Sequence, residues 1–164
     1  MTTFQVQKNE QKKIEITEPG EYTIELVGSG AHVDIHGAFL ACDRDTIDVS
    51  LFIVHSAAHT SAQTMLKGVA KDHSTVRFFG RIKIEENCPD THSFLEERVL
   101  LLSDHAKAET IPELEILSDD VKCSHAASIS RIPEEHLFYL QSRGISVAAA
   151  EELIVNGFLG RDDV

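Results

Sequence analysis

Apolar and polar residues alternate in short runs along most of the chain up to residue 130. Successive side chains of a β-strand point to opposite faces, so each run predicts a strand with one apolar face. Turn-forming residues separate the runs, for example Pro19-Gly20 and Asp43-Arg44-Asp45. The pattern therefore predicts a mostly β core over residues 14–130, preceded by a polar N-terminal arm or edge strand at residues 1–13.

Part of this pattern recurs after 32 residues. The polar turn at Asp72 is followed, ten and twelve residues later, by an alternating pair of isoleucines, and the turn at Asp104 is followed at the same offsets by Leu114 and Ile116. Repeated strands with polar corners, without long helices between them, indicate a β-solenoid or a β-sandwich. No two-residue Asn-Gly or Asp-Gly turn joins the predicted strands, which favours the solenoid.

The pattern changes after residue 130, and residues 131–164 are predicted to form a short α-helical subdomain. Pro133 followed by two glutamates is typical of a first helical turn, because proline fits there and acids favour the positive end of the helix dipole. Gly144 suits the position just beyond the end of this helix.

A second helix is predicted over residues 147–156, with Ser146 as its N-cap and Gly157 as its end. Phe158 and Leu159 follow with little chain left to cover them. We expect these two apolar residues to pack back on their own domain rather than to await a partner.

Composition narrows the function classes. A chain of 164 residues is long enough for one domain with a real core. Its net charge of −12 argues against a nucleic-acid partner. No apolar run is long enough to cross a membrane, and no apolar core of a signal peptide is seen. Three widely spaced cysteines do not form a disulfide framework, so a reducing cytoplasm is expected.

The strongest candidate chemistry is at Cys123 and His125. The two residues share one parity in a predicted strand, so the thiol and the imidazole would stand side by side on one face. These side chains suit soft and borderline metals or sulfur chemistry. A lone cysteine is more often a small buried hydrophobe, and the pair leaves both readings open.

The evidence for a functional site at the other histidines and cysteines is weaker. His55 and His59 would lie ~13 Å apart on one strand, too far for one ion, so a structural or surface role is expected. Cys42 and Cys88 have no nearby partner and are expected to be structural. The chain has no P-loop, no G-x-S-x-G and no C-x-x-C, so we expect neither nucleotide binding nor catalysis. A metal-dependent hydrolase using the two histidines and a carboxylate is the weakest alternative.

One long segment resembles a known family. The run LLLSDHAKAETIPELEILSDDVKCSHAASISRI, followed by LFYLQSRGI, is similar to the core of the SufB/SufD family of iron–sulfur cluster assembly proteins, on the SufD side. The upstream segments KGVAKDHSTVRFFGRIKI and VHSAAHTSAQ also resemble this family, and the resemblance covers roughly residues 30–158. It implies a right-handed parallel β-helix with a short C-terminal helical subdomain.

The resemblance also implies a role. The chain would be a noncatalytic scaffold for a nascent iron–sulfur cluster, working with a SufC-type ABC ATPase and with a SufB-like subunit or a second copy of itself. Cys123 and His125 match the family's K-C-S-H segment, which is implicated in cluster formation at the interface between subunits. The segment that begins the region in contact with the ATPase is matched by Phe138, Tyr139, Arg143 and Gly144.

Some features depart from the family. Its members are usually more than twice this length and carry an N-terminal helical region, and the glycine that usually follows K-C-S-H is Ala126 here. The alternative function is a plain β-helical module for homo-oligomerisation, without cluster chemistry, in which exposed strands pair edge to edge across a two-fold axis. In that case substitution of Cys123 and His125 would change no phenotype.

Overall fold

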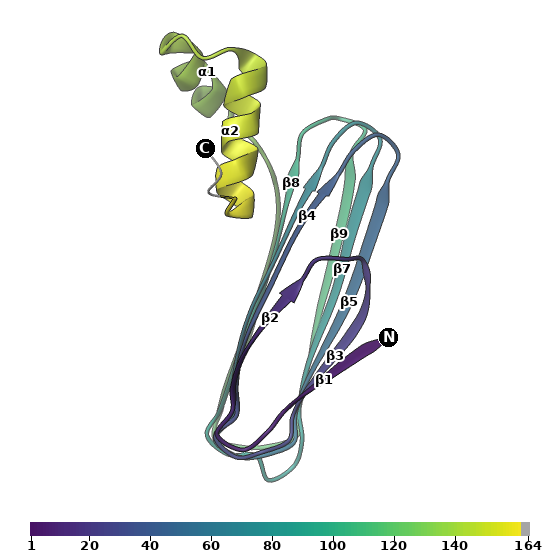
Figure 1. Ribbon diagram of the computed structural model, residues 1–164, viewed down its shortest axis with the longest axis vertical. Helices are drawn as coiled ribbons and strands as arrows, with labels where there is room; N and C mark the ends of the chain where they lie inside the picture. Colours follow the sequence, from purple (N-terminus) through teal and green to yellow (C-terminus); the bar gives the residue numbers. More distant parts are fainter. Residues whose placement is uncertain (162–164) are drawn as a thin grey trace.

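The chain folds into a parallel β-solenoid followed by two α-helices, as seen in the computed structural model, which describes residues 1–161 (Figure 1). Odd-numbered strands form one sheet, in the order β1-β3-β5-β7-β9, and even-numbered strands form the other, in the order β10-β8-β6-β4-β2. The strands are β1 (Thr2–Val6), β2 (Gln11–Ile16), β3 (Gly20–Leu26), β4 (His32–Ala41), β5 (Thr46–His55), β6 (Ser61–Ala70), β7 (Thr75–Ile84), β8 (Thr91–Leu101), β9 (Lys107–Ile116) and β10 (Val121–Arg131). The predicted mostly β solenoid with a helical C-terminal region is confirmed.

Each coil of the solenoid contributes one strand to each sheet. Because the chain crosses between the sheets at every corner, neighbouring strands within a sheet are parallel. Thr75 pairs with Thr46, which lies 29 residues earlier, and with Lys107, which lies 32 residues later. The 32-residue repeat seen in the sequence is therefore the register between β7 and β9.

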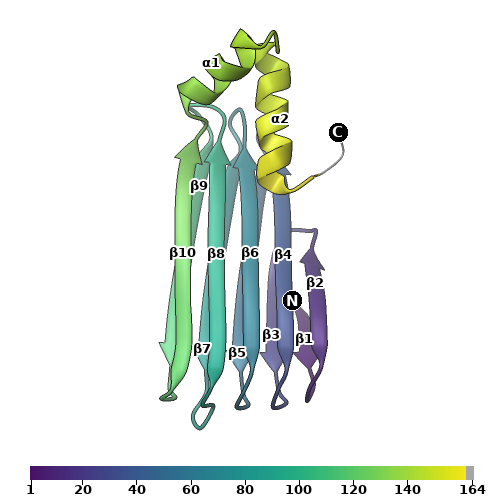
Figure 2. The same ribbon diagram turned by 90° about the vertical axis from the view of Figure 1, so that its left-hand side faces the viewer.

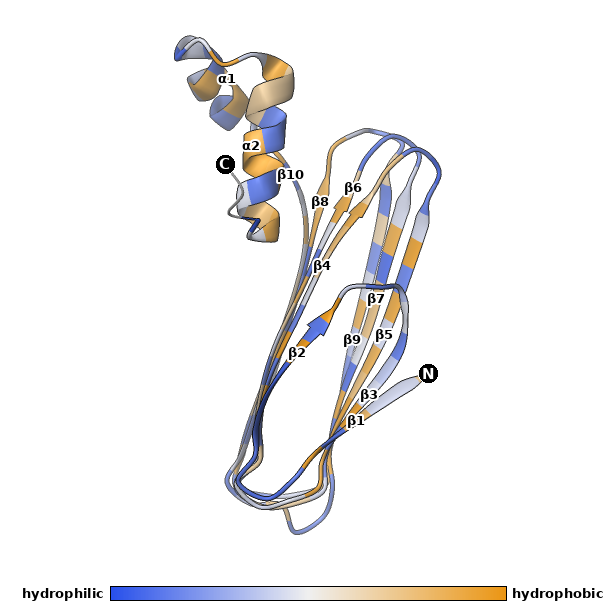
Figure 3. Cartoon of the chain, in the orientation of Figure 1, coloured by the Kyte–Doolittle hydropathy of each residue, from blue (hydrophilic) through white to orange (hydrophobic). Residues whose placement is uncertain are grey.

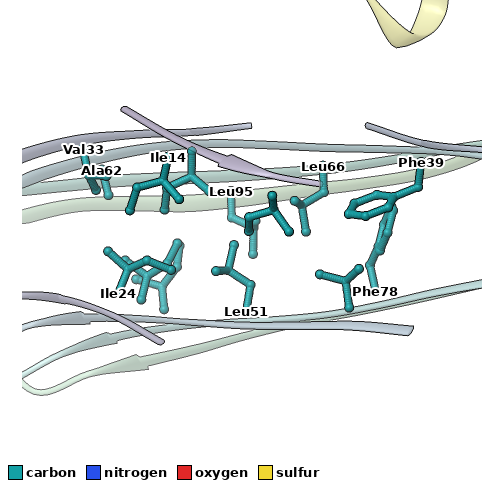
Figure 4. Close-up of a cluster of buried hydrophobic side chains, with 14 of the residues drawn as sticks. Ile14, Ile24, Val33, Phe39, Leu51, Ala62, Leu66, Phe78 and Leu95 are labelled. Carbon is teal, nitrogen blue, oxygen red and sulfur yellow. The ribbon is translucent and has the colours of Figure 1, made fainter. Parts of the chain in front are cut away.

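The core lies between the two sheets and is filled by alternate residues of each strand (Figure 4). Colouring by hydropathy shows the same alternation along the strands (Figure 3). The rings of Phe39 and Phe78 meet across the sheets with centroids 5.9 Å apart. The burial of every second residue is what fixes the faces and the register of the strands.

Short polar residues form the corners of the coils. Among residues 1–161, seven residues other than glycine have a positive φ, namely Asn9, Asp43, His59, Asp72, Asn87, Asp90 and Asp120. Asparagine and aspartate tolerate this left-handed backbone better than most residues, which explains why they recur in the sequence at the corners. The corners also stack, because the backbone N–H of Asp43 donates to Oδ2 of Asp72 in the next coil at 3.1 Å.

Residues 1–13, predicted as a polar arm or an edge strand, contain β1 and the first part of β2. Both strands are outermost in their sheets, where each pairs with a single neighbour. Their polar side chains fit an edge position, because an edge strand exposes more of its surface to water than a central strand does.

Two helices complete the chain, α1 (Glu134–Ser142) and α2 (Val147–Leu159). Ser146 caps α2, since its side chain accepts a hydrogen bond from the backbone N–H of Ala149 at 3.3 Å. The prediction that Gly157 ends this helix was wrong: the helix continues to Leu159 and ends at Gly160, which has a φ of +74°. No helix among residues 1–161 is long and apolar enough to cross a membrane.

Helix α2 packs on the outer face of the sheet that contains β4, β6 and β8 (Figure 2). Leu159 and Val155 are buried against Val69 and Leu100 of the sheet. The ring of Phe158 lies beneath the cationic groups of two flanking side chains, Lys67 at 5.8 Å and Arg98 at 5.4 Å from its centroid. The expectation that Phe158 and Leu159 pack on their own domain is confirmed. This burial also explains why α2 runs past Gly157.

The close stacking of corners predicts opposite effects for the same substitution at two glycines. A Cβ at Gly28 would lie 2.1 Å from the backbone nitrogen of Lys8, whereas a Cβ at Gly157 would have nothing within 4 Å. We expect Gly28→Ala to lower the free energy of unfolding by about 1–3 kcal/mol through overpacking. Gly157→Ala should raise it by roughly 0.5–1 kcal/mol, because alanine favours a helix. Urea unfolding measures both, and equal effects would contradict this close contact.

The uncovered end of the solenoid as the candidate functional site

In the described part of the chain, no further strand stacks on the last coil, which is formed by β9 and β10. Its apolar residues face the interior but remain partly exposed: Leu114 is 39% exposed, Ile116 42% and Ile129 45%. Their register partners in the coil beneath are at most 1% exposed; these are Ile82, Ile84 and Val99. We call this surface, formed by the inward faces of β9 and β10, the open end.

Cys123 and His125 lie on the inward face of β10, at the open end. Cys123 is in register with Ser93 and His125 with Leu95, two inward-facing residues of β8. Cys123 is half-buried against the core, and His125 is exposed. A shallow hollow of about 400 Å³ lies over β6, β8 and β10 and is lined mainly by outward-facing residues such as His92, Phe94 and Lys122, so access to Cys123 from the inward face comes from the missing coil above it. The structure thus places the two residues side by side on one face, at a surface that another molecule can reach.

Burial determines the protonation of the cysteine. It raises the pKa of the Cys123 thiol to about 11. Only about one thiol in ten thousand is then ionised at pH 7. Since the thiolate is the form that binds metals and attacks sulfur, the side chain needs an electropositive partner to become reactive.

A buried polar network lies directly beneath Cys123. Nε2 of His55 is 3.0 Å from Oγ of Ser93, and Nδ1 is 2.8 Å from Oγ1 of Thr60. The Thr60 hydroxyl donates to the carbonyl of Ala57, so we assign the ring proton to Nδ1 of His55. Burial lowers the pKa of His55 to about 4, which keeps the imidazole neutral at physiological pH.

Glu97 is a second buried titratable residue of this region, and sequence reasoning missed it. Its side chain is fully buried on the inward face of β8, and neither carboxyl oxygen has a hydrogen-bond partner among the described residues. A Cβ at Gly80 would lie 2.5 Å from Oε1, so the carboxyl group reaches across the interior to the opposite sheet. Burial raises the pKa of Glu97 to about 7. Its shared parity with Ser93 and Leu95 could have revealed it.

The remaining histidine and cysteine candidates lie apart from one another. His55 is buried, whereas His59 is at an exposed corner with Nδ1 2.9 Å from Oδ2 of Asp90. The thiol of Cys88 is buried beside the carbonyl oxygen of His55 at 3.6 Å, and burial raises its pKa. Cys42 is part-buried at the corner after β4, and all three cysteines are free thiols. Within residues 1–161, no three His, Cys, Asp or Glu side chains converge to hold a metal ion.

The second group of candidate residues lies on and after α1. None of this helix's residues is buried, and Phe138 is 74% exposed and Tyr139 57% exposed. The guanidinium of Arg143 lies 5.4 Å from the centroid of the Tyr139 ring. Gly144 follows with a φ of +85°, as predicted for a residue just beyond a helix end. Phe138 and Tyr139 are therefore exposed aromatic residues of α1, and Arg143 packs on the ring of Tyr139.

Comparison with known proteins places this geometry in context. The sequence model "SUF system FeS cluster assembly, SufBD core domain" matches residues 16–158. The chain is 35% identical over 139 residues to the iron–sulfur cluster assembly protein SufD of Bacillus subtilis, and 30% identical over 134 residues to SufD of Escherichia coli. These alignments cover 85% and 82% of the chain but 32% of each relative. The chain therefore spans about a third of the length of the curated relatives it matches.

The buried Glu97 predicts a distinctive pH dependence of stability. Its pKa is about 7 in the fold and ordinarily 4.5, so the folded state binds more protons between these pH values. The contribution of Glu97 to the free energy of unfolding then falls as pH rises through this window, by on the order of 3 kcal/mol. Glu97→Gln cannot ionise, so we expect its stability relative to wild type to increase from about pH 4.5 to about pH 8 in urea unfolding.

The adjacent Glu96 provides the matched control, because it points outward from the same strand and is partly exposed. Glu96→Gln should leave the pH profile unchanged. A stability difference between Glu97→Gln and wild type that does not vary with pH would contradict the raised pKa.

Proposed function

Because the chain belongs to the SufB/SufD family of the SUF iron–sulfur cluster assembly system, we propose that it is a noncatalytic scaffold subunit on which a nascent cluster is built. The observation that supports this role is the placement of Cys123 and His125 together on the inward face of β10, at the open end. The cluster is cargo of this scaffold, and no nucleotide is bound by the chain itself. Its proposed location is the cytoplasm.

The two side chains supply complementary ligands. A thiolate is a soft ligand for iron or a carrier of sulfur, and a neutral imidazole adds a borderline nitrogen ligand. Because the thiol of Cys123 is protonated in the free protein, arriving metal must displace its proton. Two ligands are too few for a cluster, so the others would come from a partner that covers the open end.

The open end offers a partner two kinds of interaction. The free edges of β9 and β10 carry unpaired backbone groups, which can pair with strands of another chain. Between them lie the part-exposed side chains of Leu114, Ile116 and Ile129, whose burial would add hydrophobic stabilisation. The proposed occupant is a SufB-like subunit or a second copy of this chain related by a two-fold axis.

The ATPase would bind elsewhere. We assign a SufC-type ABC ATPase to the exposed surface of Phe138, Tyr139, Arg143 and Gly144 on and after α1. Aromatic rings and arginine are the residues that most often dominate protein interfaces. Since α1 follows β10 after two residues, motion of the ATPase would be transmitted directly to the strand that carries Cys123.

The second candidate function is an oligomerisation module without cluster chemistry. It is favoured by the packing of Cys123 against the core and by the raised pKa of its thiol, which are properties of a structural cysteine. In this case the open end would still pair with another chain, but neither Cys123 nor His125 would bind iron.

Anaerobic reconstitution with ferrous iron and sulfide distinguishes the two functions. The protein is assayed with and without a SufC-type ATPase and a SufB-like subunit, and iron, sulfide and the visible spectrum are measured. For a scaffold, Cys123→Ala and His125→Ala should each reduce bound iron and sulfide severalfold, while the control Cys42→Ala should not. Equal cluster content in all variants would support the oligomerisation module. So would the absence of a cluster in the wild type with every combination of partners.

Binding of the ATPase tests the α1 surface separately. In a pull-down with a SufC-type ATPase, Phe138→Ala and Tyr139→Ala should each weaken binding by about tenfold or more, as expected for exposed aromatic anchors. Glu152→Gln, an exposed substitution on α2, serves as the control. Unchanged binding in both aromatic variants would move the ATPase contact to another surface.

A further inference from the structure

We propose that the edge of β4 at residues 38–41 binds an extended acidic peptide of a partner protein, which adds to the sheet as a further strand. We call this segment the β4 edge. The inference is independent of the cluster site, because β4 lies near the opposite end of its sheet from β10.

The β4 edge has a strand on one side only. β6 pairs with β4 along residues 32–41, whereas β2 pairs with residues 32–37 and ends there. Figure 2 shows β2 ending well short of the end of β4. The backbone groups of a strand point alternately to its two neighbours. Alternate residues of the β4 edge therefore point their N–H and C=O groups to a side on which no strand of the described chain lies.

The β4 edge lacks the features that usually prevent strand pairing. Exposed edges commonly carry charged side chains, proline or a bulge, whereas the sequence here is Ala-Phe-Leu-Ala in an unbroken register. Leu40 is 38% exposed, although Val69 and Leu100, which follow it in register, are buried beneath α2. An added strand would cover Leu40 and extend this apolar row by one residue.

A cavity beside the β4 edge suits the side chains of an acidic strand. It has a volume of about 370 Å³ and lies between the end of α2 and the outer faces of β2, β4 and β6, where Ala38 of the β4 edge lines it. The cationic residues in its lining are Lys13, Lys67 and Arg161, and the one acidic residue is Glu15. Glu15 pairs with Lys13 at 3.0 Å, so Lys67 and Arg161 remain for a ligand. In a chain with a net charge of −12, this cationic groove favours carboxylates.

Burial of the interior favours a single strand over a larger occupant. The inward-facing residues of the β4 edge, Phe39 and Ala41, are 4% and 0% exposed. A further coil with its own apolar face would therefore gain little by stacking here. A second copy is also disfavoured, because a two-fold axis at this edge would place the same cationic side chains opposite each other.

Fluorescence anisotropy of labelled peptides tests the inference on the whole chain. In a Glu-Val-Glu-Val-Leu-Val peptide, the glutamates and the leucine share the outward face of the added strand and the valines face inward. We expect this acidic peptide to bind. A Lys-Val-Lys-Val-Leu-Val peptide should bind about tenfold more weakly or worse, because its charge is reversed. The acidic peptide with N-methylated backbone should lose as much, because it cannot donate the hydrogen bonds of a strand.

Variants of the protein locate the site. Arg161→Glu and Lys67→Glu should each weaken binding of the acidic peptide by about fivefold or more. Lys122→Glu, which removes an exposed cation of β10 outside the cavity, should match the wild type. Because Lys67 also lies over the ring of Phe158, urea unfolding checks that Lys67→Glu retains the fold, and Arg161→Glu decides the matter if it does not.

Three results would overturn the inference. They are equal affinity for the acidic peptide and either counterpart, no binding of the acidic peptide by the wild type, and unchanged binding in Arg161→Glu. A dimer seen by sedimentation, if Arg161→Glu dissociates it, would instead identify a second copy as the occupant of this edge and would also overturn the inference. Cluster reconstitution at Cys123 and His125 is measured separately, so failure here is distinguishable from failure of the proposed function.

Discussion

Hydrogen bonding between parallel strands is the constraint on which this structure depends. Each strand obtains its backbone partners from the coils on either side, so the fold is stable only where coils continue to stack. Stacking ends at β9 and β10. The same interruption leaves backbone groups without partners, exposes inward-facing apolar residues and gives access to Cys123 and His125. Fold and site are therefore linked: the candidate site exists because the solenoid ends there.

Polar residues in the interior are concentrated beneath this end. The inward face of β4 carries apolar residues and Gly37, whereas that of β8 includes Thr91, Ser93 and Glu97. His55 and Glu97 oppose each other in their effect on stability. Protonation of His55 is disfavoured in the fold, which costs stability as pH falls from 6.5 to about 4, whereas ionisation of Glu97 costs stability as pH rises from 4.5 to about 7. The contributions of these two residues therefore oppose each other where the two windows overlap.

The sequence predicted the coils well because the alternation of side chains is the same constraint that stacks them. It also placed Cys123 and His125 on one face, since parity in a strand is a local property. Glu97 escaped prediction because β8 is covered on both faces: Leu95 and Val99 face the core while Leu100 faces α2. Apolar residues along β8 therefore do not alternate regularly with polar ones. The end of α2 was misplaced for a similar reason, since a tertiary contact of Leu159 outweighed the local preference of Gly157.

Neutral side chains would allow the proposed cluster site at the open end to remain stable without metal. In the free protein at about pH 6, Cys123 is a thiol, Glu97 is mostly a carboxylic acid, and both are neutral. A neutral site avoids the cost of buried charge that an empty cage of thiolates would pay. Because the same burial that makes the free ligands unreactive also strengthens their attraction to a cation, an arriving metal and a covering partner would stabilise each other.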